Sequence, residues 1–248
     1  MTKIIGIHSF RRGTGKTFFT GNLGLLLAKE GWRVAVVDTD FQAPDLHTLF
    51  DLPLDEITTT LNDFLDGNAP LEKVNYDITH RASSLKGQLY LLPASTNTGD
   101  ITKILRQGYA VEKLGDAFRK ISQAYNLDAI LMDTSAGLTE ESLRSLALAD
   151  SVAIVMLPDQ QHFQGTAVMA DLAHQLRVPS VSLVVNQVPE VYKPAQVKQE
   201  IETKYETPVL AVLPFVEECR ADEQFFVLKY PTHPLTISLM QIVLGLLK

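Results

Sequence analysis

Short apolar, β-branched runs alternate with longer amphipathic segments along the whole chain, and this alternation constrains the fold more than any other feature of the sequence. Runs of roughly five to seven residues that are apolar on both faces are typical of strands in a parallel sheet covered by helices. The runs are KIIGIHS, RVAVVDT, QLYLLPAS, DAILMDTS, SVAIVMLP, VSLVVNQV and PVLAVLP. Because helix-like segments separate them, the sequence predicts a single doubly wound α/β domain over residues 1–248, with a mostly parallel sheet flanked by helices.

Two segments stand out from this alternation. Residues 41–87 have the least regular pattern, so we expect mobile loops there. The terminal stretch PLTISLMQIVLGLLK has a wide apolar face and one charged residue, Lys248. That pattern favours a helix packed on the sheet over an amphipathic membrane anchor, which would carry more basic residues.

The composition excludes several classes of protein. A formal net charge of -7 argues against a generally basic nucleic-acid binder. Cys219 is the only cysteine, so no intrachain disulfide can form, and we expect a reducing, cytoplasmic setting. Histidine and cysteine show no HxH, HExxH or CxxC spacing, so no structural metal site is expected. No run reaches the roughly 18 apolar residues of a spanning helix, so we expect a soluble or at most peripheral protein.

The stretch FRRGTGKT has the composition of a phosphate-binding loop, placed between a predicted strand and a predicted helix. Gly13 and Gly15 would let backbone N–H groups cradle phosphates at the helix N-terminus. Lys16 would bridge the phosphate oxygens, and the Thr17 hydroxyl would bind Mg²⁺. The first glycine of the motif GxxxxGK[ST] is missing, since Phe10 stands at that position.

The stretch SFRRGTGKTFFTGNLG resembles the variant phosphate loop SGKGGVGKTTxxxNLG of the ParA/MinD family of deviant Walker ATPases, which are P-loop NTPases of the SIMIBI class. The segments VVDTD, DAILMDTSAGL, VVNQV and LPF resemble further motifs of that family and follow in the family order. FQAPDLHTLF matches the family's switch region more loosely. The similarity spans residues 3–226, and the order of the motifs makes it specific.

The resemblance implies roles for residues at the strand ends. Asp38 and Asp133 would lie close to Mg²⁺ together with Thr17. Asp40 would orient the attacking water, and Gly137 would lie near the γ-phosphate. The residues alone agree in outline, because ligands of open α/β sheets bind at the carboxyl ends of strands. A strand-end aspartate can also simply cap the next helix.

The resemblance also implies the contacts of the nucleotide. The asparagine of VVNQV would hydrogen-bond adenine, and the LPF loop would pack on the base. The predicted nucleotide-binding residues are Arg12, Gly13, Thr14, Gly15, Lys16, Thr17, Phe18, Asn186, Pro214 and Phe215, and the predicted catalytic residues are Lys16, Asp40 and Arg11.

The two arginines of the loop allow three hypotheses. Arg11 stands where the family has the extra lysine that reaches the phosphates of the partner subunit, and a guanidinium suits phosphate oxygens. Arg12, in place of a family glycine, could take that role or act in cis as an arginine finger. Both could instead be solvated surface cations. If position 12 required a positive φ, arginine there would be strained by about 1 kcal/mol.

The resemblance implies a slow, partner-stimulated ATPase that uses ATP/ADP and Mg²⁺ and forms an ATP-dependent homodimer. Thr134 stands where many other P-loop ATPases carry a catalytic glutamate after the Walker B aspartate, which fits slow hydrolysis. Such switches position a chromosome, a plasmid or a protein assembly such as a carboxysome, with an activating adaptor protein. A nucleotide-binding regulator or scaffold with negligible hydrolysis is the alternative. An amidotransferase or synthetase related by fold would need a second catalytic constellation, such as a Cys and His pair, that the sequence lacks.

Family members bind either nucleoid DNA or a membrane. The basic candidates for DNA are Lys193, Lys198, Lys204, Arg220 and Lys229. Glutamates 200, 202 and 206 interleave with the first three, which favours a solvated face of mixed charge. The charge distribution therefore does not favour binding to DNA, and the terminal segment does not favour binding to a membrane.

Overall fold

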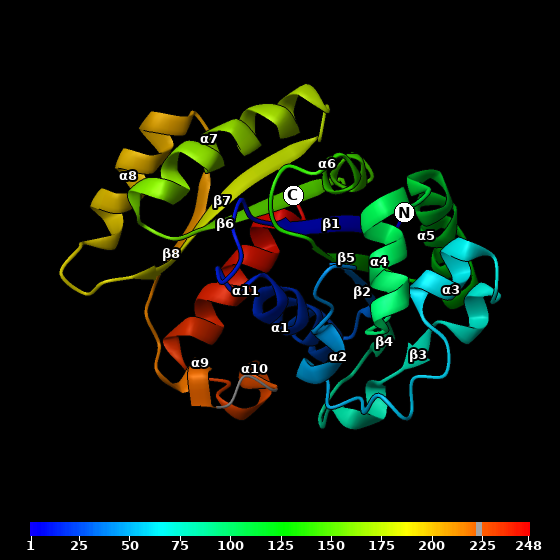
Figure 1. Ribbon diagram of the computed structural model, residues 1–248. Coiled ribbons are helices and arrows are strands. Elements are labelled where there is room, and N and C mark those ends of the chain that lie inside the picture. The colour runs from blue at the N-terminus through cyan, green and yellow to red at the C-terminus, as the bar shows by residue number, and fades with distance from the viewer. Residues whose placement is uncertain (222–224) are drawn as a thin grey trace.

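The computed structural model describes residues 1–221 and 225–248, and these form an eight-stranded sheet with helices on both faces (Figure 1). The strands are β1 (Lys3–His8), β2 (Arg33–Thr39), β3 (Tyr76–Asp77), β4 (Gln88–Leu92), β5 (Ala129–Thr134), β6 (Ser151–Met156), β7 (Ser180–Val188) and β8 (Val209–Pro214). Their order across the sheet is β3-β4-β2-β5-β1-β6-β7-β8. All neighbours pair in parallel except β3, which is antiparallel to β4. The predicted doubly wound, mostly parallel sheet is thus confirmed.

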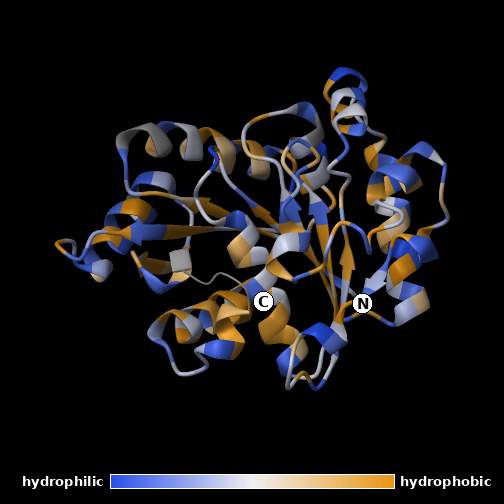
Figure 2. Ribbon diagram, turned by 60° about the horizontal axis from the view of Figure 1, so that its bottom comes forward, coloured by the Kyte–Doolittle hydropathy of each residue, from blue (hydrophilic) through white to orange (hydrophobic). Residues whose placement is uncertain are grey.

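Alternation along each strand divides the buried side chains between two hydrophobic cores. In β2, Val34 and Val36 face one core while Ala35 and Val37 face the other. One layer of helices consists of α1 (Lys16–Lys29), α2 (Leu46–Leu49), α10 (Phe226–Lys229) and α11 (Pro234–Leu246). The other consists of α3 (Leu61–Asp66), α5 (Val111–Tyr125), α6 (Glu140–Leu146), α7 (Gln160–Gln175) and α8 (Pro194–Tyr205). Hydrophobic residues accordingly run along the strands between the two layers (Figure 2).

The terminal helix α11 packs on the sheet, as the sequence predicts. It contacts β6, β8 and α1, and its own residues Leu239, Ile242 and Leu246 are buried in that contact. Within the described residues, no helix combines the length and the apolar character needed to cross a bilayer.

The segment from residue 41 to residue 87 contains only short elements, in agreement with its irregular sequence pattern. Besides α2, α3 and β3 it contains the 3₁₀ turns η1 (Leu71–Lys73) and η2 (Thr79–Arg81). The chain also forms α4 (Thr98–Gln107) and α9 (Glu218–Ala221), which the sequence pattern does not predict. The side chain of Asn97 caps α4 by accepting a hydrogen bond from the Gly99 N–H at 2.7 Å. No residue of α4 is fully buried, and its Ile104 packs partly buried against the core.

Candidate functional site

The glycine-rich loop between β1 and α1 obtains its sharp turn from two glycines. Gly13 has a φ of 79° and Gly15 a φ of 96°, both in the left-handed region that favours glycine. Arg12 lies outside that region, so the backbone strain expected at this position does not arise. The Ser9 hydroxyl donates a hydrogen bond to the Arg11 carbonyl at 2.5 Å, which closes the turn. Replacing the family glycine by arginine therefore leaves a well-formed phosphate loop.

Phe10 turns away from the loop and packs on helix α7. A Cβ atom placed on Gly165 of α7 would lie 2.0 Å from Phe10 Cδ1 and 2.2 Å from Cγ. The ring therefore lies directly against the Gly165 backbone, in contact with the same hydrophobic core as α7. Phe10, which stands in place of the first glycine of the motif, thus anchors the loop to α7 through hydrophobic packing.

Two buried aspartates face each other across strands β2 and β5. Asp38 pairs in register with Asp133, and the side chains are 0% and 1% exposed. The Thr17 hydroxyl donates to Asp133 Oδ2 at 2.6 Å. Asp38 accepts backbone N–H groups from Asp40 at 3.1 Å and Leu46 at 3.2 Å. The sequence prediction that Asp38, Asp133 and Thr17 lie together is therefore reproduced in the geometry.

The electrostatics of this pair fit a divalent cation. Burial raises the pKa of Asp133 to about 6, and burial together with the Asp133 charge raises the pKa of Asp38 well above its usual value. Two carboxyl groups that are costly to ionise without a counter-charge, beside a threonine hydroxyl, offer the oxygen ligands that Mg²⁺ prefers. These three side chains could hold magnesium.

Lys16 and Asp40 lie almost buried at the same edge of the sheet. Lys16 is 6% exposed and Asp40 is 8% exposed. Burial raises the pKa of Asp40, while the positive charges of Lys16 and Arg12 oppose that rise. Arg12 Nη2 lies 4.0 Å from Asp40 Oδ1, and the same guanidinium donates a long hydrogen bond of 3.5 Å to Gln42. Arg12 thus bridges the phosphate loop and the segment after β2, while Arg11 lies exposed on the loop.

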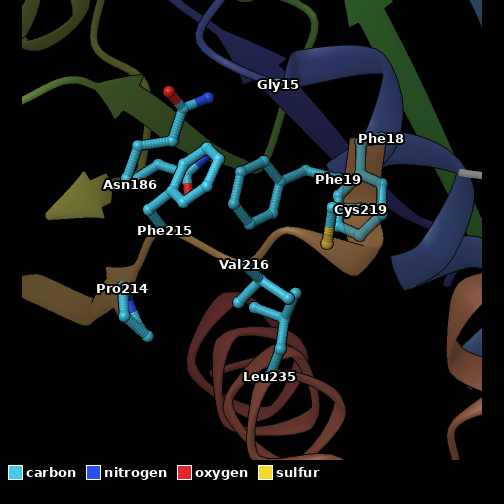
Figure 3. A pocket seen from close by; sticks show the side chains of 10 residues that line it. Gly15, Phe18, Phe19, Asn186, Pro214, Phe215, Val216, Cys219 and Leu235 are labelled. Atoms are coloured by element: carbon cyan, nitrogen blue, oxygen red, sulfur yellow. The ribbon is translucent and has the colours of Figure 1, made fainter. Parts of the chain in front are cut away.

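A pocket beside the loop gathers the residues predicted to hold the base (Figure 3). Its cavity volume is about 100 Å³. Rings from α1 and from the loop after β8 point into it (Figure 3). It is lined by Gly15, Phe18, Phe19, Asn186, Gln187, Pro214, Phe215, Val216, Cys219 and Leu235. The predicted Phe18, Asn186, Pro214 and Phe215 are therefore brought together with Gly15.

An irregularity in β7 shapes this pocket. The pairing of β7 with β8 shifts between Val185 and Val188, and Gln187 has a φ of 56°. Consecutive strand residues normally face opposite sides, but here Asn186 and Gln187 both line the pocket. Asn186 Nδ2 donates to the Thr14 carbonyl at 2.9 Å and so ties β7 to the phosphate loop.

Several lining residues were missed by sequence reasoning. Phe19 and Gln187 adjoin predicted residues, so the motifs themselves could have indicated them. Val216 likewise follows the predicted Phe215, whereas Cys219 and Leu235 lie in segments without a nucleotide-binding motif, and only the fold brings them to the pocket.

His8, at the end of β1, is a second feature that the motifs do not indicate. It is fully buried, and burial with the nearby Lys16 charge lowers its pKa to about 3, so the ring is neutral. Its Nε2 lies 3.1 Å from the Gly137 carbonyl and its Nδ1 lies 2.6 Å from the Thr134 hydroxyl. Since a carbonyl only accepts, the neutral ring donates from Nε2, and Nδ1 then faces the Thr134 hydroxyl, whose one proton is shared between Nδ1 and the Ile7 carbonyl at 2.8 Å. The Gly137 N–H in turn donates to the Ser9 carbonyl at 3.0 Å.

The basic residues considered for DNA do not form a uniform patch. Lys198 Nζ lies 3.7 Å from Glu202, and Lys204 Nζ lies 5.1 Å from the centre of the Phe163 ring. The side chain of Arg220 lies outside the described residues. The predicted face of mixed charge on α8 matches these contacts.

Comparison with known proteins gives a consistent relationship. A family model described as an AAA domain matches residues 2–180. An uncharacterised ATP-binding protein of Methanocaldococcus jannaschii is 29% identical over 250 residues, which cover 100% of this chain and 88% of that protein. The septum site-determining protein MinD of Synechocystis is 28% identical over 218 residues, covering 86% of this chain and 76% of the relative.

Solved structures show the same fold. The structure of MinD from Pyrococcus horikoshii complexed with Mg-ADP superimposes with a TM-score of 0.80 at 24% identity, covering 98% of this chain and 95% of that chain. Since the family model covers most of the chain and the phosphate loop, strand-end aspartates and pocket follow one another in the family order, the chain belongs to the MinD/ParA family of P-loop ATPases.

Proposed function

We propose that this chain is a slow ATPase switch in which ATP closes a homodimer and hydrolysis, stimulated by an adaptor protein, opens it. The cycle would position or partition a cargo inside the cell, such as a chromosome, a plasmid or a protein assembly of the carboxysome type. Sequence relatives named as septum site-determining proteins support a role in spatial organisation.

The observation that carries this proposal is the convergence of charged groups at one edge of the sheet. The Lys16 charge acts on Asp40 and on Asp133, and Arg12 contacts Asp40 at 4.0 Å. Phosphoryl transfer needs little covalent chemistry from a protein, so positioning and charge stabilisation suffice. Lys16 would neutralise developing phosphate charge, and Asp40 would hold the attacking water.

The remaining predicted residues would bind the nucleotide and its metal. Thr17, Asp38 and Asp133 would hold Mg²⁺, which supplies positive charge to the phosphate oxygens. Gly13, Thr14 and Gly15 would present backbone N–H groups to the phosphates. The base would occupy the pocket formed by Phe18, Asn186, Pro214 and Phe215.

Arg11 is the candidate for the charge that crosses to the partner subunit. It stands at the position of the family's extra lysine and is exposed on the loop, as is Arg12, whose guanidinium also lies near Asp40 of the same subunit. The contact of Arg12 supports a role in cis, either in orienting Asp40 or as an arginine finger.

Phosphate release and molar mass test the proposal together. The wild-type protein should release phosphate slowly and reach dimer mass in light scattering only with ATP and Mg²⁺. Lys16→Ala should lose tight nucleotide binding, and full ATP affinity in that variant would overturn the site assignment. Asp40→Ala should keep the ATP-bound dimer while losing turnover.

The Arg11→Ala variant separates the two roles of the arginines. Because Arg11 would act on the partner's nucleotide, ATP affinity should stay within a few-fold of wild type while hydrolysis or dimerisation falls strongly. Unchanged turnover and unchanged ATP-dependent dimer mass would contradict a role for Arg11 across the dimer.

A nucleotide-binding regulator with negligible hydrolysis is the second candidate. It is favoured by the contact of Arg12 with Asp40, which engages the proposed water-orienting carboxylate, and by Thr134 in place of a glutamate. ATP-dependent dimerisation without phosphate release, with and without candidate partners, would support this alternative.

The surface to which the dimer would bind is tested separately. Retention on DNA that depends on ATP and falls with salt would indicate a nucleoid surface. Pelleting with liposomes that depends on ATP would indicate a membrane. The mixed charge of α8 and the packed position of α11 give neither surface particular support.

A further inference from the structure

Two segments that would sense the nucleotide leave the neighbouring strands β2 and β5 and line one cavity. The first follows β2 and contains Asp40 and Phe41, and the second follows β5 and leads through Gly137 into α6. Residues of both segments, together with α4, line a cavity of about 230 Å³. The strands are paired as far as Thr39 and Thr134, and beyond that pair a side chain that contacts both segments can couple their motions.

Tyr109 has such a side chain. This residue lies between α4 and α5, outside both segments, and lines the cavity. Its ring packs edge-on against Phe41, with centroids 4.7 Å apart and planes at 62°. Its hydroxyl lies 2.5 Å from the hydroxyl of Ser145 on α6. One side chain thus contacts both segments.

Each contact is close to a group that the proposed reaction uses. Phe41 is the neighbour of Asp40 along the chain and is only 2% exposed, so anchoring its ring fixes the backbone from which the carboxylate projects. Ser145 is fully buried one helical turn after Ser142, whose hydroxyl lies 3.2 Å from the Gly137 carbonyl. The path from Asp40 to Gly137 therefore runs through ring packing, one hydrogen bond and one turn of helix.

We propose that Tyr109 is a positioning residue that couples the Asp40 segment to the Gly137 segment, so that the two move together as nucleotide is exchanged. The inference rests on the proposed ATPase function for Asp40 and Gly137. The Tyr109 side chain would hold the water-orienting carboxylate and the γ-phosphate loop in register with each other, and it would touch neither the nucleotide nor the metal.

Three variants test the hydrogen bond. Tyr109→Phe keeps the ring on Phe41 but removes the hydroxyl, and Ser145→Ala removes its partner. Each should lower turnover at saturating ATP about three- to tenfold, which corresponds to one net hydrogen bond, with the KM for ATP within about twofold of wild type. Because both changes break the same contact, the double variant should be no slower than the slower single variant.

A control removes tyrosine hydrogen bonds elsewhere. The Tyr76 hydroxyl donates to the Thr59 carbonyl at 2.8 Å and accepts the Thr59 N–H at 3.0 Å, outside the lining of the cavity beside Tyr109. Tyr76→Phe should lower the Tm but leave turnover unchanged. Wild-type turnover in Tyr109→Phe, or losses that multiply in the double variant, would overturn the coupling.

A second measurement does not depend on hydrolysis. Phe41→Leu removes the ring that contacts Tyr109, and amide hydrogen exchange should then accelerate in residues 135–146 as well as around residue 41. Acceleration confined to the mutated segment would refute the coupling even in a protein without ATPase activity. Absence of phosphate release from the wild type, with exchange still coupled, would instead count against the proposed function alone.

Discussion

Gly165→Ala is the substitution that most directly tests the anchoring of the phosphate loop. In a helix interior this change normally stabilises a protein by about 1 kcal/mol, because alanine has the higher helix propensity. Here the new Cβ would lie 2.0 Å, 2.2 Å and 2.3 Å from Cδ1, Cγ and Cε1 of Phe10. Either the ring stays and the site is overpacked, or the ring leaves its place against α7.

Both outcomes have a similar free-energy cost. Overpacking costs about 1–3 kcal/mol, and removing a large side chain from its buried contacts costs about 1.5–3 kcal/mol. With overlap at three ring atoms the upper part of this range applies, so after the gain in helix propensity the free energy of unfolding should fall by about 2 kcal/mol. For a chain of this size that is a decrease in Tm of about 4–8 °C.

The effect should extend to nucleotide binding because Phe10 belongs to the phosphate loop. We expect Gly165→Ala to weaken the binding of a fluorescent ATP analogue, although Gly165 lies outside the lining of the nucleotide pocket. Phe10→Ala removes the ring, so adding Gly165→Ala in that background should stabilise the protein, as in an ordinary helix. If Gly165→Ala destabilises the wild type but stabilises the Phe10→Ala variant, the loss comes from the contact between Phe10 and Gly165 and not from a general defect of α7.

Gly115→Ala in α5 is the matched control. Its Cβ would meet only the flexible Leu148 side chain, at 3.2 Å, so the higher helix propensity of alanine should keep the free energy of unfolding at or above the wild-type value while nucleotide affinity is unchanged. If Gly165→Ala were as stable as wild type and bound nucleotide equally well, the account of Phe10 as an anchor would be refuted.

Two further predictions concern the metal site and the base pocket. The raised pKa of Asp133, about 6, means that the folded state binds more protons than the unfolded state between roughly pH 4 and 6, so this group lowers stability as pH rises through that window. His8, with its lowered pKa, acts in the opposite direction, so the measurement is the difference in Tm between Asp133→Asn and wild type without nucleotide. The Tm of Asp133→Asn relative to that of wild type should rise from pH 5 to pH 7. A Tm difference that stays constant over this range would refute the raised pKa of Asp133. Phe215→Ala should weaken binding of the ATP analogue about tenfold through loss of aromatic contact, while Ile237→Ala on the exposed side of α11 should not. Equal affinities in these two variants would exclude the pocket as the base site.

The sequence predicts the parts of the fold that carry their own local pattern. The long parallel strands are uninterrupted apolar runs, and Asp38 and Asp133 mark the ends of two of them, so their meeting at one edge follows from parallel pairing. Strand β3 has only two residues and exists through its antiparallel pairing with β4, which no local pattern records.

The parts of the site that were not predicted depend on contacts between distant segments. In the sequence, Phe10 is only a departure from the glycine of the phosphate-loop motif. Its role depends on the contact of its ring with Gly165, which is far away in the chain and which no local pattern indicates. Leu235 reaches the base pocket only because α11 packs against α1. Tyr109 lies in the short connection between α4 and α5, which has no sequence motif. It contacts Phe41 and Ser145 only because the fold brings this connection next to the segment after β2 and to α6.

The strand order also has a consequence for how the protein is made. Strand β1, which leads into the phosphate loop, lies in the centre of the sheet between β5 and β6, where Lys3 pairs with Ala129 and Ile5 with Ser151. At a synthesis rate of roughly 5–20 residues per second, the first strand waits on the order of ten seconds or more for its neighbours. The phosphate loop therefore emerges well before the strands that flank β1, and the site at the strand ends can be completed only late in synthesis.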